Sequence, residues 1–200
     1  RLAAIHSLFG YAALSHPEHA GTIQRVLAIP TKRHDRRAVT WLTDVEVDAL
    51  LAAPDRGTWA GRRDHAMFVL AVQTGLRISE LIGLSRGDVE LERGPHVRCM
   101  GKGRKERATP LTRLTVAVLR EWLEERGGQP SDPLFPTRTG TRLSHDAIED
   151  RLAGHLDAAR ISCRSLRGKH VTMHTLRHTA AMRLLHTGTD IAVMALWLGH

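Results

Sequence analysis

Four short segments combine basic side chains with glycines or helix boundaries, a setting in which a side chain is held rigidly. They are TGLRISEL at residues 74–81, GKGRKER at 101–107, HTLRH at 174–178 and LGH at 198–200. The planar fork of arginine makes bidentate contacts to phosphate, and histidine or lysine can transfer a proton. Each segment is weak alone, but together they indicate a site for an anion.

The first segment places Arg77 two residues after Gly75, at the junction of two expected helices. Backbone N–H groups at a helix N-terminus favour anions, so an arginine held there is a candidate anion ligand. A surface salt bridge is the common alternative for such an arginine, and this segment alone leaves both roles open.

The second segment is expected at the tip of a β-hairpin. Glycines on both sides of Lys102 let the backbone turn tightly and approach a ligand closely. Lysine is also common in ordinary exposed turns. However, the chain has four lysines and two of them, Lys102 and Lys105, lie here, which favours a functional role.

The third segment holds His174 and Arg177, which are three residues apart and therefore project from one face of a helix. Both belong to its first turn, near the positive end of the helix dipole. His174 and His178 also have the spacing of a zinc pair. The metalloprotease pattern requires glutamate at the position of Thr175, so we do not expect a metal.

The fourth segment ends the chain. Ile191, Met194, Ala195 and Leu198 form an apolar stripe that we expect to be buried, and Gly199 then ends the helix before His200. A histidine after a helix is usually a cap that interacts with the dipole, so this feature alone is not specific.

The elements that position these residues follow from the hydrophobic periods. The alternating pattern of two short segments predicts strands, and the 3.6-residue period of the others predicts helices. The fold class is mainly α with a small antiparallel β-sheet. We expect helices at 1–15, from Thr43 onward, 64–74, 78–83, 112–126, 144–158, 174–187 and 190–198, and strands at 96–100 and 106–111.

The chain divides near its start. Residues 1–15 cannot enclose a core, and the polar, basic residues 31–39 are typical of a linker. Thr43 and Glu46 then form a capping box that opens the next domain. We therefore expect residues 1–33 to be the C-terminal remnant of a helical domain with its linker, and 34–200 to be a second domain. Without an initiator methionine, the chain is expected to begin inside a longer one.

Composition points to a polyanionic partner. The chain has 29 Lys+Arg against 21 Asp+Glu, a formal net charge of +8, and nucleic acid is the commonest polyanion in a cell. Cys99 and Cys163 lie far apart and form no C-x-x-C pair, which fits a reducing cytoplasm better than a disulfide framework. No apolar run approaches the roughly 20 residues of a membrane span, so we expect no membrane partner.

Taken in order, TGLRISEL, GKGRKER followed by TPL, HTLRH and WLGH resemble the motifs of the tyrosine recombinase, or phage integrase, family. The likeness covers about residues 40–200, and residues 1–33 resemble the last helix of the family's core-binding domain. It implies the tyrosine-recombinase catalytic-domain fold, double-stranded DNA as partner, assembly with other recombinase protomers on DNA, and no cofactor.

The resemblance also implies roles for individual residues. Arg77 and Arg177 would clamp the scissile phosphate, with Glu80 as a supporting acidic residue. Lys102 would be the general acid for the 5′-hydroxyl leaving group. His174 would assist as acid/base and phosphate ligand, and His200 would hydrogen-bond the phosphate.

The sequence departs from the family at the nucleophile, which is expected several residues downstream of His200. Tyr11, the one tyrosine in the 200 residues, is expected to pack within the N-terminal helix. The resemblance implies a site-specific DNA recombinase that cleaves and rejoins strands through a 3′-phosphotyrosyl intermediate. Two other hypotheses stay open: a non-catalytic DNA-binding protein derived from an integrase, and, more remotely, a metal-dependent hydrolase using His174 and His178.

Overall fold

The computed structural model describes residues 2–30, 40–101 and 106–199, which fall into two compact units, Arg1–Ala38 and Val39–His200. Lys102, Lys105, His200 and the linker predicted at 31–39 lie outside the described residues. Along the described residues, no helix combines the length and the apolar character needed to span a membrane.

The first unit contains helix α1 (Leu2–Ser15), a 3-10 turn η1 (Pro17–His19) and helix α2 (Ala20–Leu27). The helix predicted at 1–15 is confirmed, whereas η1 and α2 were not predicted. Ile23 is buried, but Leu8 and Leu14 are exposed. Tyr11 is 71% exposed, so it is not packed against the described residues of this unit.

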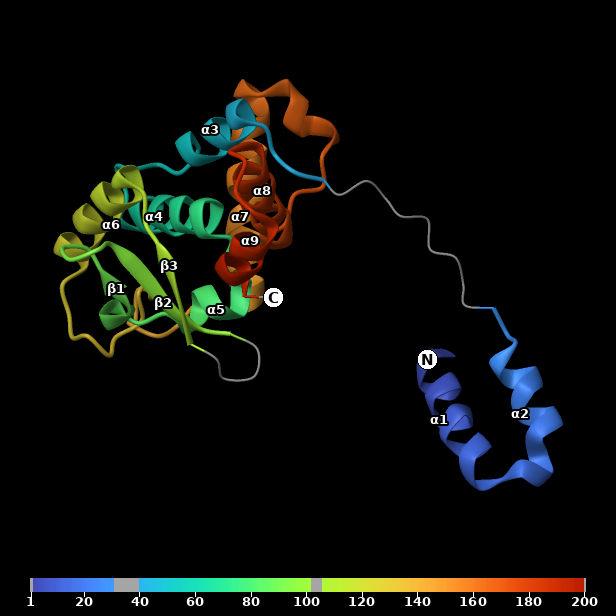
Figure 1. Cartoon of the computed structure of the whole chain (residues 1–200). Coiled ribbons are helices and arrows are strands. Elements are labelled where there is room, and N and C mark those ends of the chain that lie inside the picture. Colours follow the sequence, from blue (N-terminus) through green and yellow to red (C-terminus); the bar gives the residue numbers. More distant parts are fainter. Residues whose placement is uncertain (1, 31–39, 102–105, 200) are drawn as a thin grey trace. The chain divides into compact units, whose positions relative to one another are not determined.

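The second unit is a helical body with a small sheet beside it (Figure 1). The 3-10 turns η2 (Arg86–Asp88) and η4 (Arg164–Gly168) join some of its elements. Its described helices are α3 (Asp44–Ala52), α4 (Trp59–Thr74), α5 (Ile78–Gly83), α6 (Arg113–Arg126), α7 (His145–Ser162), α8 (Met173–His186) and α9 (Ile191–Leu198).

The sheet has the order β1-β2-β3 and is antiparallel, with strands β1 (Val89–Glu90), β2 (His96–Met100) and β3 (Glu106–Pro110). His96 pairs with Pro110 and Met100 with Glu106, which confirms the predicted pair of strands. Strand β1 was not predicted, because two residues are too few to show an alternating pattern.

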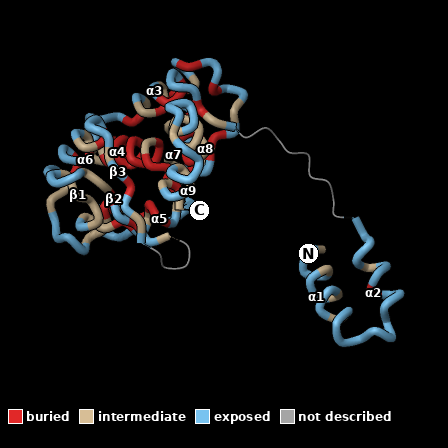
Figure 2. The backbone as a smooth tube through the Cα atoms, in the orientation of Figure 1, coloured by how far each residue is buried: buried red, intermediate tan, exposed pale blue. Residues whose placement is uncertain are grey.

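Helix α4 is the centre of the core. Its residues from Arg63 to Val72 are all buried, and Figure 2 shows this helix in red between less buried neighbours. The helix begins at Trp59, five residues before the predicted start, because Thr58 caps it by accepting from the backbone N–H of Gly61 at 3.0 Å.

Helix boundaries follow the capping residues closely. In the predicted box at α3, Thr43 N–H donates to Glu46 at 2.9 Å and Glu46 N–H donates to the Thr43 hydroxyl at 3.4 Å. Ser144 caps α7, which runs to Ser162 and so ends four residues later than predicted. Gly188 and Gly199 have φ of +74° and +70°, as expected for glycines that end helices.

The buried stripe predicted on α9 is only partly correct. Leu198 is buried, and Met194 and Ala195 are half-buried, but Ile191 is 76% exposed. In its first turn the helix therefore turns an apolar side chain outward, because α9 packs on the body chiefly through its C-terminal end.

Candidate functional site

Arg77 stands at the end of α4 and the start of α5. Gly75 ends α4 with φ of +65°, and the chain then turns so that Arg77 becomes the N-cap of α5. The backbone N–H of Arg77 donates to Glu80 Oε2 at 2.7 Å, and its Nη1 donates to Glu80 Oε1 at 2.9 Å. Glu80 thus fixes both the backbone and the guanidinium of Arg77.

Arg177 extends from α8 to the same junction. Its Nη1 donates to the carbonyl of Gly75 and its Nη2 to the carbonyl of Leu198, both at 2.6 Å. Burial, followed by the nearby charge of Arg77, lowers the pKa of Arg177 to about 10. The side chain therefore stays charged at neutral pH while it lies close to a second cation, an arrangement that an anion would stabilise.

A cavity of about 450 Å³ opens beside these arginines. His174 is exposed on the same side of α8, and its ring meets that of His178 edge to face at 4.2 Å between centroids. Burial, with the adjacent His174 and Arg177, lowers the pKa of His178, which favours its neutral form. The cavity is lined by Leu76, Arg77, Ile78, Ser79, His145, Glu149, Met173, His174 and Arg177.

Two polar residues that line this cavity, Glu149 and His145, were not predicted from the sequence. The Glu149 carboxylate accepts from the backbone N–H of Met173, with both oxygens at 3.3 Å, and so supports the start of α8. His145, the first residue of α7, faces the same cavity. Since His145 and Glu149 lie 25 or more residues before HTLRH, no local spacing in the sequence links them.

A third arginine was also missed. Arg107 of β3 donates to Glu80 Oε1 through Nη1 and to Oε2 through Nη2, each at 2.8 Å. Burial alone would raise the pKa of Glu80, but hydrogen bonds from Arg107 and Arg77 outweigh it and lower that pKa. A buried carboxylate such as Glu80 needs more than one half-exposed arginine to balance its charge, so a second cation is expected beside it. Nothing local in the sequence shows which residue supplies that cation.

The end of α9 closes the site from the other direction. The carbonyl of Gly199 accepts from Arg77 Nη2 at 3.2 Å, so α5 and the end of α9 lie side by side (Figure 1). Of the five residues predicted to do chemistry, the structure therefore brings together Arg77, His174 and Arg177. Lys102 and His200 lie outside the described residues, next to Gly101 and Gly199.

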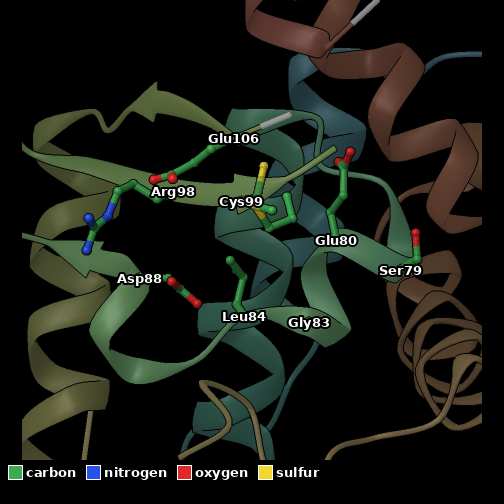
Figure 3. Close-up of a pocket in the computed structure, with 9 residues that line it drawn as sticks. Ser79, Glu80, Gly83, Leu84, Asp88, Arg98, Cys99 and Glu106 are labelled. Carbon is green, nitrogen blue, oxygen red and sulfur yellow. The ribbon is translucent and has the colours of Figure 1, made fainter. Parts of the chain in front are cut away.

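A second cavity of about 430 Å³ lies between α5 and the sheet, and it has a different character (Figure 3). Its polar lining includes the carboxylates of Glu80, Asp88 and Glu106 beside Arg98. Burial raises the pKa of the Cys99 thiol, which also faces this cavity. Three carboxylates oppose an anionic ligand, so the first cavity is the candidate phosphate site. Among the described residues, no group of three or more His, Cys, Asp or Glu side chains gathers to hold a metal.

Comparison with known proteins agrees with this geometry. Residues 40–200 match the model of the phage integrase family. The chain is 57% identical over its full length to the protein named integrase/recombinase y4rC of Sinorhizobium fredii, and covers 60% of it. It is 38% identical over 164 residues to the tyrosine recombinase XerD of Pseudomonas aeruginosa, covering 80% of this chain and 53% of XerD.

Solved structures give the same result. The XerH site-specific recombinase in a post-cleavage complex with palindromic difH substrate matches 87% of this chain and 51% of its own, with a TM-score of 0.72 and 26% identity. The XerA recombinase matches the whole chain and 74% of its own, with a TM-score of 0.71; at 24% identity this shows the fold alone.

The chain therefore belongs to the phage integrase family, and its second unit has the tyrosine-recombinase catalytic-domain fold. This confirms the fold predicted from the four motifs. The chain spans a little over half the length of the first curated relatives that it matches.

Proposed function

We propose that the chain carries the catalytic domain of a site-specific DNA recombinase, which cuts and rejoins strands through a 3′-phosphotyrosyl intermediate. The observation that carries this proposal is the meeting of Arg77, Arg177 and His174 around one cavity. Two guanidinium groups held in place suit a single phosphodiester, and XerH, of the same fold, was solved in a post-cleavage complex with its palindromic difH substrate.

In the proposed reaction, a tyrosine oxygen attacks the phosphorus while the bond from phosphorus to the 5′ oxygen breaks. Lys102 gives its proton to that oxygen, His174 takes up the proton of the tyrosine, and His200 hydrogen-bonds the phosphate. The tyrosine is proposed to lie on a segment after His200. The free 5′-hydroxyl of another strand then reverses the step and rejoins the DNA.

The roles of the arginines follow from charge. Negative charge gathers on the equatorial oxygens as the phosphate becomes pentavalent, so fixed cations stabilise the transition state more than the ground state. The side chain of Arg77 is 33% exposed, and we assign it the direct contact with the phosphate. Arg177 is buried and contributes its charge from the wall of the cavity.

The proposed partners are double-stranded DNA and further recombinase protomers assembled on it, with no metal or other cofactor required. A cytoplasmic, DNA-associated location follows from this activity. A non-catalytic DNA-binding protein derived from an integrase is the competing function, because it would keep the same grip on phosphate.

Covalent capture separates these two functions. The protein, produced with its native downstream residues, is mixed with fragments of its source genome, denatured with detergent, and the attached DNA is sequenced. We expect a single sequence to be enriched after denaturation. DNA recovered before denaturation but never after it would favour the non-catalytic protein.

A further inference from the structure

Arg107 makes a buried, bidentate ion pair with Glu80. The two guanidinium nitrogens face the two carboxylate oxygens at 2.8 Å each, and the side chains are 10% and 4% exposed. Buried bidentate pairs of this kind fix geometry as well as charge, because both groups lose their freedom to rotate. The pair joins strand β3 to helix α5, which are separated by more than 20 residues in sequence.

Glu80 transmits this order to Arg77. Each carboxylate oxygen of Glu80 accepts one N–H from Arg107 and one from Arg77, so four donors surround a single buried carboxylate. Figure 3 shows Glu80 reaching from α5 toward the strands beside Cys99. Without Arg107, Arg77 alone would have to balance this carboxylate, and its guanidinium would be drawn further onto Glu80.

Arg107 also contacts the end of α9. A Cβ added to Gly199 would lie 2.5 Å from Arg107 Nη1 and 3.0 Å from its Cζ, so the glycine leaves room for this guanidinium. The carbonyl of the same glycine accepts from Arg77. Arg107 thus lies against both residues that accept hydrogen bonds from the guanidinium of Arg77, which are Glu80 and Gly199.

We propose that Arg107 is a positioning residue for strand cleavage, which acts through Glu80 to hold the guanidinium of Arg77 on the scissile phosphate. This inference rests on the proposed function. Arg107 does not line the cavity beside Arg77 and His174, so its action on the phosphate is indirect.

The chain offers a matched control. Arg62 and Glu125 form another bidentate pair, with Nε and Nη2 each 2.7 Å from a carboxylate oxygen, and neither residue touches the site. This pair is more exposed, with side chains that are 38% and 29% exposed, and Arg62→Gln removes it without altering Glu80. A loss seen with Arg107→Gln and not with Arg62→Gln therefore belongs to the site rather than to ion pairing in general.

The experiment measures covalent adduct formation by the full protein on its target duplex, carrying either an ordinary scissile phosphate or a methylphosphonate. The methyl group replaces one charged oxygen, so little negative charge remains at that position for a cation to stabilise. We expect Arg107→Gln to slow cleavage of the ordinary substrate about 10- to 100-fold, and Arg62→Gln less than about 2-fold. On the methylphosphonate, the deficits of Arg107→Gln and Arg77→Ala should shrink together.

Arg107→Lys tests the same idea if the glutamine variant folds poorly. Lysine keeps the charge but loses the fork, so this variant should melt near the wild-type temperature and still cleave more slowly. Wild-type cleavage rates for both Arg107 variants would overturn the inference, and so would an equal loss on both substrates. A wild-type protein that forms no adduct would instead refute the proposed function.

Discussion

The carbonyl oxygen of Gly75 lies 2.6 Å from Nη1 of Arg177, so the turn that ends α4 is also the acceptor that holds the buried arginine of α8. The same turn leads directly into Arg77. One backbone feature therefore sets the positions of both arginines, although they are 100 residues apart in sequence.

Gly75→Ala should destabilise the protein. Alanine at φ of +65° costs about 1–2 kcal/mol, and its Cβ would lie 2.8 Å from Leu198 Cδ2 and 3.1 Å from Ala180 Cβ. Denaturant unfolding should show a loss of about 2 kcal/mol or more. Gly154→Ala is the control. This glycine lies inside α7 with nothing near its Cβ position, so the change should raise the free energy of unfolding by about 0.5–1 kcal/mol. Equal effects at both positions would contradict this reading of the turn.

Acid should remove a specific contribution from Glu46. Burial alone would raise its pKa, but hydrogen bonds from Lys169 and Ser165 and from the Thr43 backbone outweigh burial and lower the pKa to about 2. A folded-state pKa below the ordinary 4.5 means that the stabilisation is complete above about pH 4.5 and is lost as the pH falls toward 2.

The measurement compares the wild type with Glu46→Gln in urea between pH 7 and pH 3. At pH 7 the wild type should be more stable by on the order of 2 kcal/mol, and the difference should narrow below about pH 4.5. Other groups titrate alike in both proteins, so their contributions cancel in the difference between the two free energies of unfolding. A constant difference across this range would show that the Glu46 carboxylate is not the titrating group.

Binding to duplex DNA should weaken steeply with salt. A net charge of +8, supplied mainly by arginine, implies contacts to several phosphates and release of their counterions. Titrating a labelled duplex at 50 mM and 200 mM salt should show a loss of affinity of about 10-fold or more. An affinity that is the same at both concentrations would contradict a phosphate-tracking surface.

Lys102 should matter for cleavage far more than Lys105. In the protein with its downstream residues, Lys102→Ala should block cleavage of an ordinary substrate, whereas Lys105→Ala should have a small effect. A 5′-bridging phosphorothiolate should rescue Lys102→Ala, because sulfur leaves without a proton. No rescue on this substrate would remove Lys102 from the role of general acid.

The sequence predicted much of this fold because caps and periods are local signals. Thr43 with Glu46, Ser144 and Gly188 each mark a helix end through their own hydrogen bonds or φ. The start of α4 was misplaced because a helix buried along its length loses the 3.6-residue polar period. An apolar stripe also does not show which of its residues will be buried. Ile191 belongs to the stripe of α9 but is exposed.

The site was predictable only where its residues lie in short motifs. Arg77 and His174 with Arg177 come from motifs with helix-end spacing. Arg107 also lies in a motif, GKGRKER, but its ion pair with Glu80 joins β3 to α5, and no local pattern encodes that contact. His145 and Glu149 were missed for the same reason, because α7 meets the start of α8 through tertiary packing.

We propose that Arg77 and Arg177 hold a phosphate for attack by a tyrosine that follows His200. The direct measurement uses a suicide duplex, nicked near the cleavage site found by covalent capture, and denaturing electrophoresis. The protein with its native downstream residues should form a covalent DNA adduct, and Arg77→Ala and Arg177→Ala should reduce it at least 100-fold while still binding DNA. Residues 1–200 alone should form none. An adduct from residues 1–200 alone, or one undiminished in both arginine variants, would contradict the account.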